Sequence, residues 1–170
     1  DTTLSVHVAT ADGAGTTADS DYLSTEGTLS FVGKSGESKT IVVLVIGDKN
    51  VELDESFSVN LSNMNATGRA VTISDAQGLG TVINDDAAGL SINDLAINEG
   101  AEGITSLTLT VSLNAQVDAA LTVDFATTDG TATVADGDYT AEADTLTFAG
   151  TLDETQSIMI SVNGDPRIEG

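Results

Sequence analysis

Carboxylates that recur at a fixed spacing are the residues of this sequence best suited to chemistry. The pattern Asp-x-Asp-Tyr occurs at residues 19–22 and again at residues 136–139. Several carboxylates close together raise one another's pKa unless a cation neutralises them. Calcium suits such a cluster because it takes roughly six to eight oxygen ligands in flexible geometry. A solvated acidic loop is the other interpretation. Among the acids that recur at an offset of 117 are Asp12/Asp129, Asp19/Asp136, Asp21/Asp138, Asp48/Asp165 and Glu52/Glu169.

These acids belong to an internal repeat. At an offset of 117, residues 1–53 align with residues 118–170 without a gap, and 22 of these 53 positions are identical. A polar stretch, Asn84 to Gly89, separates two apolar regions and predicts domains at residues 1–86 and 87–170. Repeats of this kind indicate stacked or tandem units of one fold.

Both predicted repeats are incomplete when each is compared with the other. The first lacks the counterpart of residues 88–117, and the second lacks the counterpart of residues 54–86. We therefore expect a window from a longer tandem array. The alternative is a shorter protein whose missing strands come from a neighbouring chain, by strand donation to an open sheet edge.

The hydrophobic pattern predicts an all-β fold. Apolar residues alternate with polar ones around Leu4–Val8, Phe57–Leu61 and Leu107–Leu113, which is the period of a half-buried strand. The run Ile41–Ile46 is apolar at every position, as in a strand covered on both sides. Turn residues such as Asp12-Gly13 separate the runs. We predict antiparallel β-sandwiches of about seven strands per repeat.

Charge and composition exclude several classes of function. The 170 residues carry 27 acids and 5 bases, a net charge of −22. This charge excludes nucleic-acid binding and argues against binding to an anionic membrane surface. No apolar run approaches the roughly 20 residues of a membrane span, so no membrane insertion is expected. With one His and no Cys, zinc ligation is disfavoured and no catalytic triad is recognisable, so we expect no enzyme.

The order of these motifs resembles the Calx-beta domain family. The matching features are Asp21-Tyr22, Thr28 to Phe31, Gly47 to Phe57, and a closing Asn84-Asp85-Asp86. The second repeat adds an opening Asn98-Glu99-Gly100 before Asp138-Tyr139 and Gly164 to Glu169. The resemblance covers nearly the whole chain. It implies tandem immunoglobulin-like sandwiches, both incomplete here, with Ca²⁺ bound by loops at one end.

The resemblance also implies which residues would bind calcium. The family's ligands are the Glu of the opening motif, the Asp before Tyr, the loop after Gly-Asp, and the closing acids. The implied ligands of the first repeat are Asp21, Asp48, Glu52, Glu55, Asp85 and Asp86. Those of the second repeat are Glu99, Asp138, Asp165 and Glu169.

We therefore predict a calcium-stabilised structural or adhesive repeat of a large secreted or cell-surface protein: a spacer, adhesin stalk, matrix or filament. Calcium near Asp85 and Asp86 would neutralise the loops and stiffen one repeat against the next. The expected partners are calcium ions, neighbouring repeats in cis, and other chains through strand exchange or head-to-tail assembly. A calcium-sensing regulatory domain and a metal-free spacer or glycan-binding sandwich are the alternatives.

Overall fold

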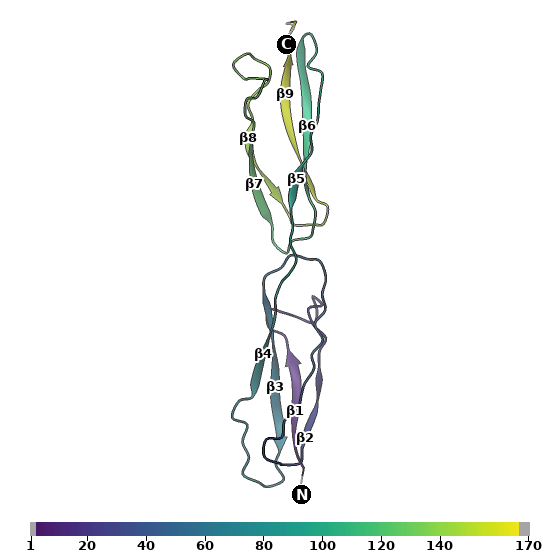
Figure 1. Ribbon diagram of the computed structural model, residues 1–170, viewed down its shortest axis with the longest axis vertical. Coiled ribbons are helices and arrows are strands. Elements are labelled where there is room, and N and C mark those ends of the chain that lie inside the picture. Colours follow the sequence, from purple (N-terminus) through teal and green to yellow (C-terminus); the bar gives the residue numbers. More distant parts are fainter. Residues whose placement is uncertain (1–2, 167–170) are drawn as a thin grey trace. The chain divides into compact units, whose positions relative to one another are not determined.

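The computed structural model describes residues 3–166, and every regular element in that range is a β-strand. The strands are β1 (Leu4–Ala11), β2 (Glu26–Phe31), β3 (Glu55–Asn65), β4 (Gln77–Val82), β5 (Leu90–Ile92), β6 (Gly103–Leu113), β7 (Leu121–Ala126), β8 (Ala143–Phe148) and β9 (Thr155–Gly164) (Figure 1). Within residues 3–166 we find no helix long and apolar enough to cross a membrane. The prediction of an all-β, antiparallel fold is confirmed.

The chain divides into two compact units. The first unit comprises Asp1–Asp48 and Leu53–Asp85, and the second comprises Lys49–Glu52 and Asp86–Gly170. Each unit is described by itself below.

The first unit contains a four-stranded antiparallel sheet in the order β2-β1-β3-β4. Val6 and Val8 of β1 are buried at 7% and 3% exposure, as their alternation with polar residues predicts. The ring of Phe57 stacks on Tyr22 with centroids 4.4 Å apart. Gly80 lies opposite Phe57 in the register, and a Cβ there would be 2.4 Å from the ring. Glycine at that position therefore leaves room for the aromatic pair.

Residues 38–47 of the first unit differ from the sequence prediction. The run Ile41–Ile46 was expected to be a strand covered on both sides, but Val42 is 67% and Leu44 59% exposed. Its ladder is reduced to one antiparallel bridge, between Tyr22 and Val45. Within residues 3–166 no strand pairs with its other edge, which explains both the exposure and the missing strand geometry.

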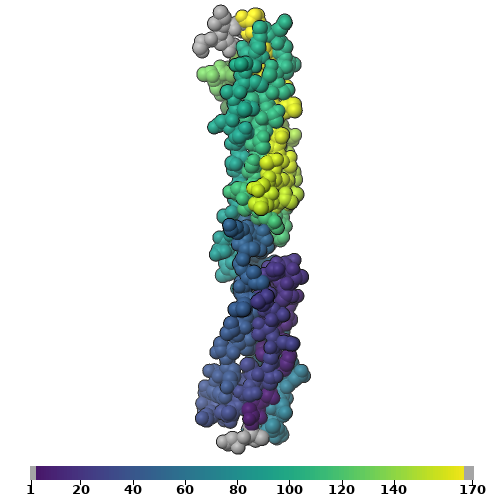
Figure 2. All heavy atoms as spheres, turned by 90° about the vertical axis from the view of Figure 1, so that its right-hand side faces the viewer, coloured from purple at the N-terminus to yellow at the C-terminus, as the bar shows by residue number. Residues whose placement is uncertain are grey.

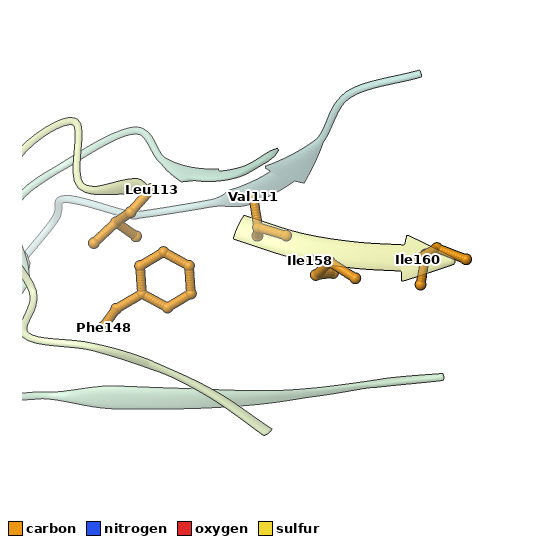
Figure 3. Packing of buried hydrophobic residues seen from close by; sticks show 5 residues of the cluster. All are labelled: Val111, Leu113, Phe148, Ile158 and Ile160. Atoms are coloured by element: carbon orange, nitrogen blue, oxygen red, sulfur yellow. The ribbon is translucent and has the colours of Figure 1, made fainter. Parts of the chain in front are cut away.

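The second unit is a two-layer sandwich. The sheet β5-β6-β9 forms one layer and the hairpin β7-β8 the other. Its core consists of Val111, Leu113, Phe148, Ile158 and Ile160. Figure 3 shows the Phe148 ring directly beneath Leu113, with Ile158 and Ile160 along β9. β9 also contributes to the outer surface (Figure 2, yellow), since alternate side chains such as that of Met159 point outward at 64% exposure.

Candidate functional site

The Asp-Tyr loop is built in the same way in both units. In the first, Tyr22 donates its hydroxyl hydrogen to Asp12 Oδ1 at 2.6 Å, and the Thr17 amide donates to the same oxygen at 3.1 Å. In the second, the Tyr139 hydroxyl and the Val134 amide donate to Asp129 Oδ1 at 2.6 and 3.0 Å. The recurring Asp12/Asp129 pair therefore anchors the loop to its tyrosine.

These hydrogen bonds shift the pKa values of both partners. The tyrosine hydroxyl, followed by the backbone amide, holds the pKa of Asp12 and of Asp129 below the ordinary value. Burial and then the bond to Asp12 raise the pKa of Tyr22. At Tyr139 the bond to Asp129 is the larger cause of the raised pKa, with burial second. The anionic carboxylate and the neutral phenol are thus the states that the loop stabilises.

Asp21 and Asp138, two of the predicted ligands, close the same loops from the inside. They are 8% and 9% exposed. Oδ2 of Asp21 accepts the Thr16 amide at 2.6 Å, and Oδ2 of Asp138 accepts the Thr133 amide at 2.7 Å. Each carboxylate is therefore fixed in orientation by a backbone donor through one of its two oxygens.

The second unit brings Asp138 and Glu99 together. Both line one cavity of about 370 Å³, whose other walls include Tyr139 and Leu107. The Glu99 carbonyl accepts the Thr105 hydroxyl at 3.1 Å, and the Asp138 carbonyl accepts the Asn163 amide at 2.9 Å. These bonds hold both residues at the Gly103/Gly164 end of the β6-β9 ladder.

Asp165 follows the last residue of β9, Gly164, and that end of β9 lies against the backbone of Glu99. A Cβ on Gly164 would lie only 2.9 Å from the Glu99 carbonyl oxygen, so the bare glycine allows the two backbones to approach. Asp165 follows directly and is partly buried. Three of the four ligands predicted for this repeat therefore come from segments that meet at one end of the unit. The fourth, Glu169, lies outside the described residues.

The structure brings fewer of the ligands predicted for the first repeat to one place. The Asp21 carbonyl accepts the Ile46 amide at 2.9 Å, two residues before Asp48. Glu55 lies beside the Asp-Tyr loop, since a Cβ on Gly15 would be 3.6 Å from its Oε2. Asp85 follows Asn84, whose amide donates to Asp54 Oδ1 at 3.1 Å. Glu52 and Asp86 group with the second unit.

The side chains as placed do not form a complete metal centre. Over the described range, no three His, Asp or Glu side chains lie close enough together to share one ion. The candidate metal ligands at the Glu99 end of the second unit are all oxygen atoms, which calcium prefers and zinc does not. The Glu99 and Asp138 carboxylates, which line one cavity, are oxygen ligands of that kind, and two carboxylates alone are fewer than the six to eight oxygens of a calcium site.

The candidate residues chosen from the sequence did not include Glu37, which also recurs. Glu37 accepts the amides of Val32, Gly33 and Lys34 at 3.1, 3.0 and 3.4 Å. Its counterpart Glu154 accepts the amides of residues 149–151 at 2.9, 3.0 and 3.2 Å. At Glu37 desolvation is the largest single influence and raises the pKa, but the three amide hydrogen bonds together hold the pKa below its ordinary value. At Glu154 the Ala149 amide is the largest cause of the lowered pKa, and desolvation opposes it. The same offset of 117 was the signal that could have found this turn.

The comparisons with known proteins cover the whole chain. The family model described as the Calx-beta domain matches twice, over residues 1–87 and 83–170. Among solved structures, the calcium binding domain CBD12 of CALX1.1 is similar at 23% identity and a TM-score of 0.43. The alignment covers 93% of this chain and 62% of that one.

A second solved structure, CBD12 from CALX1.2, is similar at 24% identity and a TM-score of 0.43, over 95% of this chain and 62% of that one. The chain thus spans less than two thirds of the length of these structures. With two matches that together span its length, the chain belongs to the Calx-beta domain family.

Proposed function

We propose that this chain is a calcium-stabilised structural and adhesive repeat of a secreted or cell-surface protein. The observation that carries the proposal is the convergence of Glu99 and Asp138 on one cavity, with Asp165 at the adjoining strand end. The net charge of −22 favours a cation as the partner of these loops.

Glu99, Asp138 and Asp165 would hold the ion in the second unit, with carbonyl oxygens and water completing the shell. When bound, calcium supplies positive charge that neutralises the carboxylates. The chain's own residues orient the ligands: Thr133 fixes the Asp138 carboxylate, and Tyr139 fixes the loop that carries it through Asp129. The ligands proposed for the first repeat are Asp21, Asp48, Glu52, Glu55, Asp85 and Asp86, and Glu169 completes the set proposed for the second repeat.

The role we propose is mechanical. Three segments that meet through a few hydrogen bonds would become cross-linked by one ion, which stiffens the end of the unit. A ligand bound only by the folded state stabilises it by RT ln(1 + [L]/Kd), about 2.7 kcal/mol at a hundredfold excess. Extracellular calcium modules work at Kd values of about 10⁻⁴–10⁻³ M, which suits a permanently loaded spacer.

The test is a thermal unfolding experiment on the full chain in calcium, in magnesium and in chelator at constant ionic strength. Glu99→Gln is the key variant, because it removes a ligand charge without removing the hydrogen bond that closes the Asp138 loop. We expect calcium to raise the unfolding temperature of wild type, and to raise that of Glu99→Gln much less. Asp118→Asn, at an exposed acid outside the cavity, is the matched control and should respond as wild type does.

Equal unfolding temperatures in calcium and chelator for wild type would contradict the proposal. The acids would then be a solvated surface, and the metal-free spacer would be the better interpretation.

A further inference from the structure

The last two residues of β9 are the one Asn-Gly pair of the chain, Asn163-Gly164. Such a pair can react with itself, because glycine has no Cβ to shield its backbone nitrogen from the asparagine side chain before it. Every other asparagine of the sequence is followed by a residue with a side chain. Asn163 is therefore the asparagine best suited to spontaneous deamidation.

The side chain of Asn163 ties β9 to the Asp-Tyr loop of the second unit. Its Nδ2 donates to the Gly137 carbonyl at 2.7 Å, and its backbone amide donates to the Asp138 carbonyl at 2.9 Å. Gly137 has a left-handed backbone, with a φ of 89°. Two bonds from one residue thus hold the turn that leads directly into the buried Asp138.

The first repeat has only one of these two bonds. Ile46 is the counterpart of Asn163, and its amide donates to the Asp21 carbonyl at 2.9 Å. An isoleucine side chain has no hydrogen-bond donor, so no equivalent of the Nδ2 bond can form there. The backbone bond therefore belongs to the fold of the repeat, whereas the side-chain bond is particular to the second unit.

The glycine of the pair is covered by the backbone of a neighbouring turn. A Cβ on Gly164 would lie 2.8 Å from the Gly100 carbonyl oxygen and 2.9 Å from that of Glu99. The Thr105 hydroxyl donates to the Glu99 carbonyl at 3.1 Å and so helps to hold this turn. Because Asn163 is held at Nδ2 and Gly164 against this turn, we expect the pair to react only when this end of β9 opens.

We propose that Asn163-Gly164 is a site of spontaneous deamidation, and that the reaction removes the side-chain bond between β9 and the Asp-Tyr loop. The Gly164 nitrogen attacks Cγ of Asn163 and gives up its proton to water. The Cγ–Nδ2 bond breaks, and Nδ2 takes up a proton from water and leaves as ammonia. Water then opens the cyclic imide at either carbonyl, which leaves aspartate or isoaspartate at residue 163. The net change is water consumed and ammonia released.

The product has no donor for the Gly137 carbonyl. A carboxylate at residue 163 would place an acceptor opposite another acceptor. It would also add a negative charge next to Asp138 and two residues before Asp165. We therefore expect the loop of residues 133–138 to open more often after the reaction. None of these steps needs calcium.

The first experiment follows isoaspartate by peptide mapping while the full chain is incubated in chelator. A synthetic peptide of residues 160–166 gives the rate of the same reaction without the fold. In the folded chain we expect isoaspartate to form at residue 163 before it forms at any other asparagine. We expect the rate to be at least ~10-fold lower than in the peptide, because only the open state reacts.

Two variants of the full chain separate opening from the reacting pair itself. Thr105→Val removes the hydroxyl that holds the Glu99 carbonyl, and it should raise the rate of deamidation at Asn163 severalfold. Thr145→Val is the matched control, because the Thr145 hydroxyl donates to Asp124 within the β7-β8 hairpin, which belongs to the other sheet. The control should react at the wild-type rate.

Amide exchange in chelator tests the side-chain bond. Asn163→Asp imitates the product of the reaction, and Asn163→Ile introduces the residue of the first repeat. Both should speed exchange of the Thr133 and Asp138 amides, which close the loop, and Asn163→Asp should do so at least ~10-fold. The equivalent amides of Thr16 and Asp21 in the first unit are the internal control and should exchange as in wild type.

The proposal is wrong if isoaspartate at residue 163 forms as fast in the folded chain as in the peptide, or does not form in the folded chain during the whole incubation. Equal rates in Thr105→Val and wild type would also contradict it, as would unchanged exchange of the Thr133 amide in Asn163→Asp. Because every measurement is made in chelator, failure here is separate from failure of the calcium-binding proposal.

Discussion

The two units place the same sequence repeat in two different surroundings. Phe31 is partly buried, while its counterpart Phe148 is completely buried. The aromatic residue of the Asp-Tyr loop shows the reverse, since Tyr22 is 1% exposed and Tyr139 is only partly buried. Identical residues therefore differ in burial because different strands lie next to them.

The neighbouring strands account for both differences. In the second unit, Leu113 of β6 packs in the same cluster as Phe148 (Figure 3). In the first unit, Phe57 of β3 stacks on Tyr22, whereas a cavity lies beside Tyr139. Each unit is well packed on the side that its extra strands cover and loosely packed on the other.

Replacing the phenylalanine that the two repeats share should give the largest difference in stability between the two units. Phe148→Ala removes a fully buried ring and should destabilise the second unit by about 3–5 kcal/mol. Phe31→Ala removes a partly exposed ring and should cost the first unit less than half of that. Hydrogen exchange of the β8 and β2 amides would read each unit separately. Equal costs would show that the difference in burial does not decide how much each ring stabilises its unit.

A glycine at the strand end should give the next largest difference. Gly164→Ala places a Cβ 2.8 Å from the Gly100 carbonyl oxygen, so the Glu99 backbone must move at a cost of about 1–3 kcal/mol. Its counterpart Gly47 faces open space within 4 Å, and Gly47→Ala should be close to neutral. Chemical denaturation followed by hydrogen exchange would measure both.

The same two glycine variants also test the proposed calcium site. If Glu99 and Asp165 are ligands of one ion, Gly164→Ala should also reduce the calcium-dependent rise in unfolding temperature, while Gly47→Ala should not. A full calcium response in Gly164→Ala would mean that the approach of these two backbones is not needed for the ion.

The fold could be predicted from the sequence where neighbouring strands are part of the chain. The alternation at Leu107–Leu113 and Leu4–Val8 identified β6 and β1, and both have sheet partners along their length. The run Ile41–Ile46 has equally strong strand character, yet it forms one bridge. Periodicity reports which face a strand would bury, and it contains no information on whether a partner is present.

The site could be predicted only in part, for a related reason. The repeat showed which acids recur, and the second unit brings Glu99, Asp138 and Asp165 to one end. It did not show that Asp12 and Glu37 recur because they accept hydrogen bonds from within their own loops. A recurring carboxylate can serve a backbone amide as well as a metal ion, and spacing alone does not separate the two.

The smallest difference should come from the tyrosine hydroxyls. Tyr22→Phe removes the bond to Asp12 in a buried setting and should cost about 1 kcal/mol. Tyr139→Phe removes the equivalent bond to Asp129 where water can replace it, so the second unit should lose less. Unfolding at neutral pH, with amide exchange at residues 17 and 134, would compare the two loops.

The pH dependence of these variants follows from the direction of the pKa shifts. Because the folded pKa of Asp12 is lowered, its contribution is complete above its unfolded pKa, about 4, and is lost as pH falls through the folded value. Because the folded pKa of Tyr22 is raised, its contribution to stability is complete below its unfolded pKa, about 10, and is lost as pH rises through the folded value. Wild type should therefore lose more stability than Tyr22→Phe at both extremes, because the variant lacks the bond that couples the two groups. Parallel curves for the two proteins would mean that Asp12 is held by the Thr17 amide alone, and that the tyrosine contributes packing rather than a hydrogen bond.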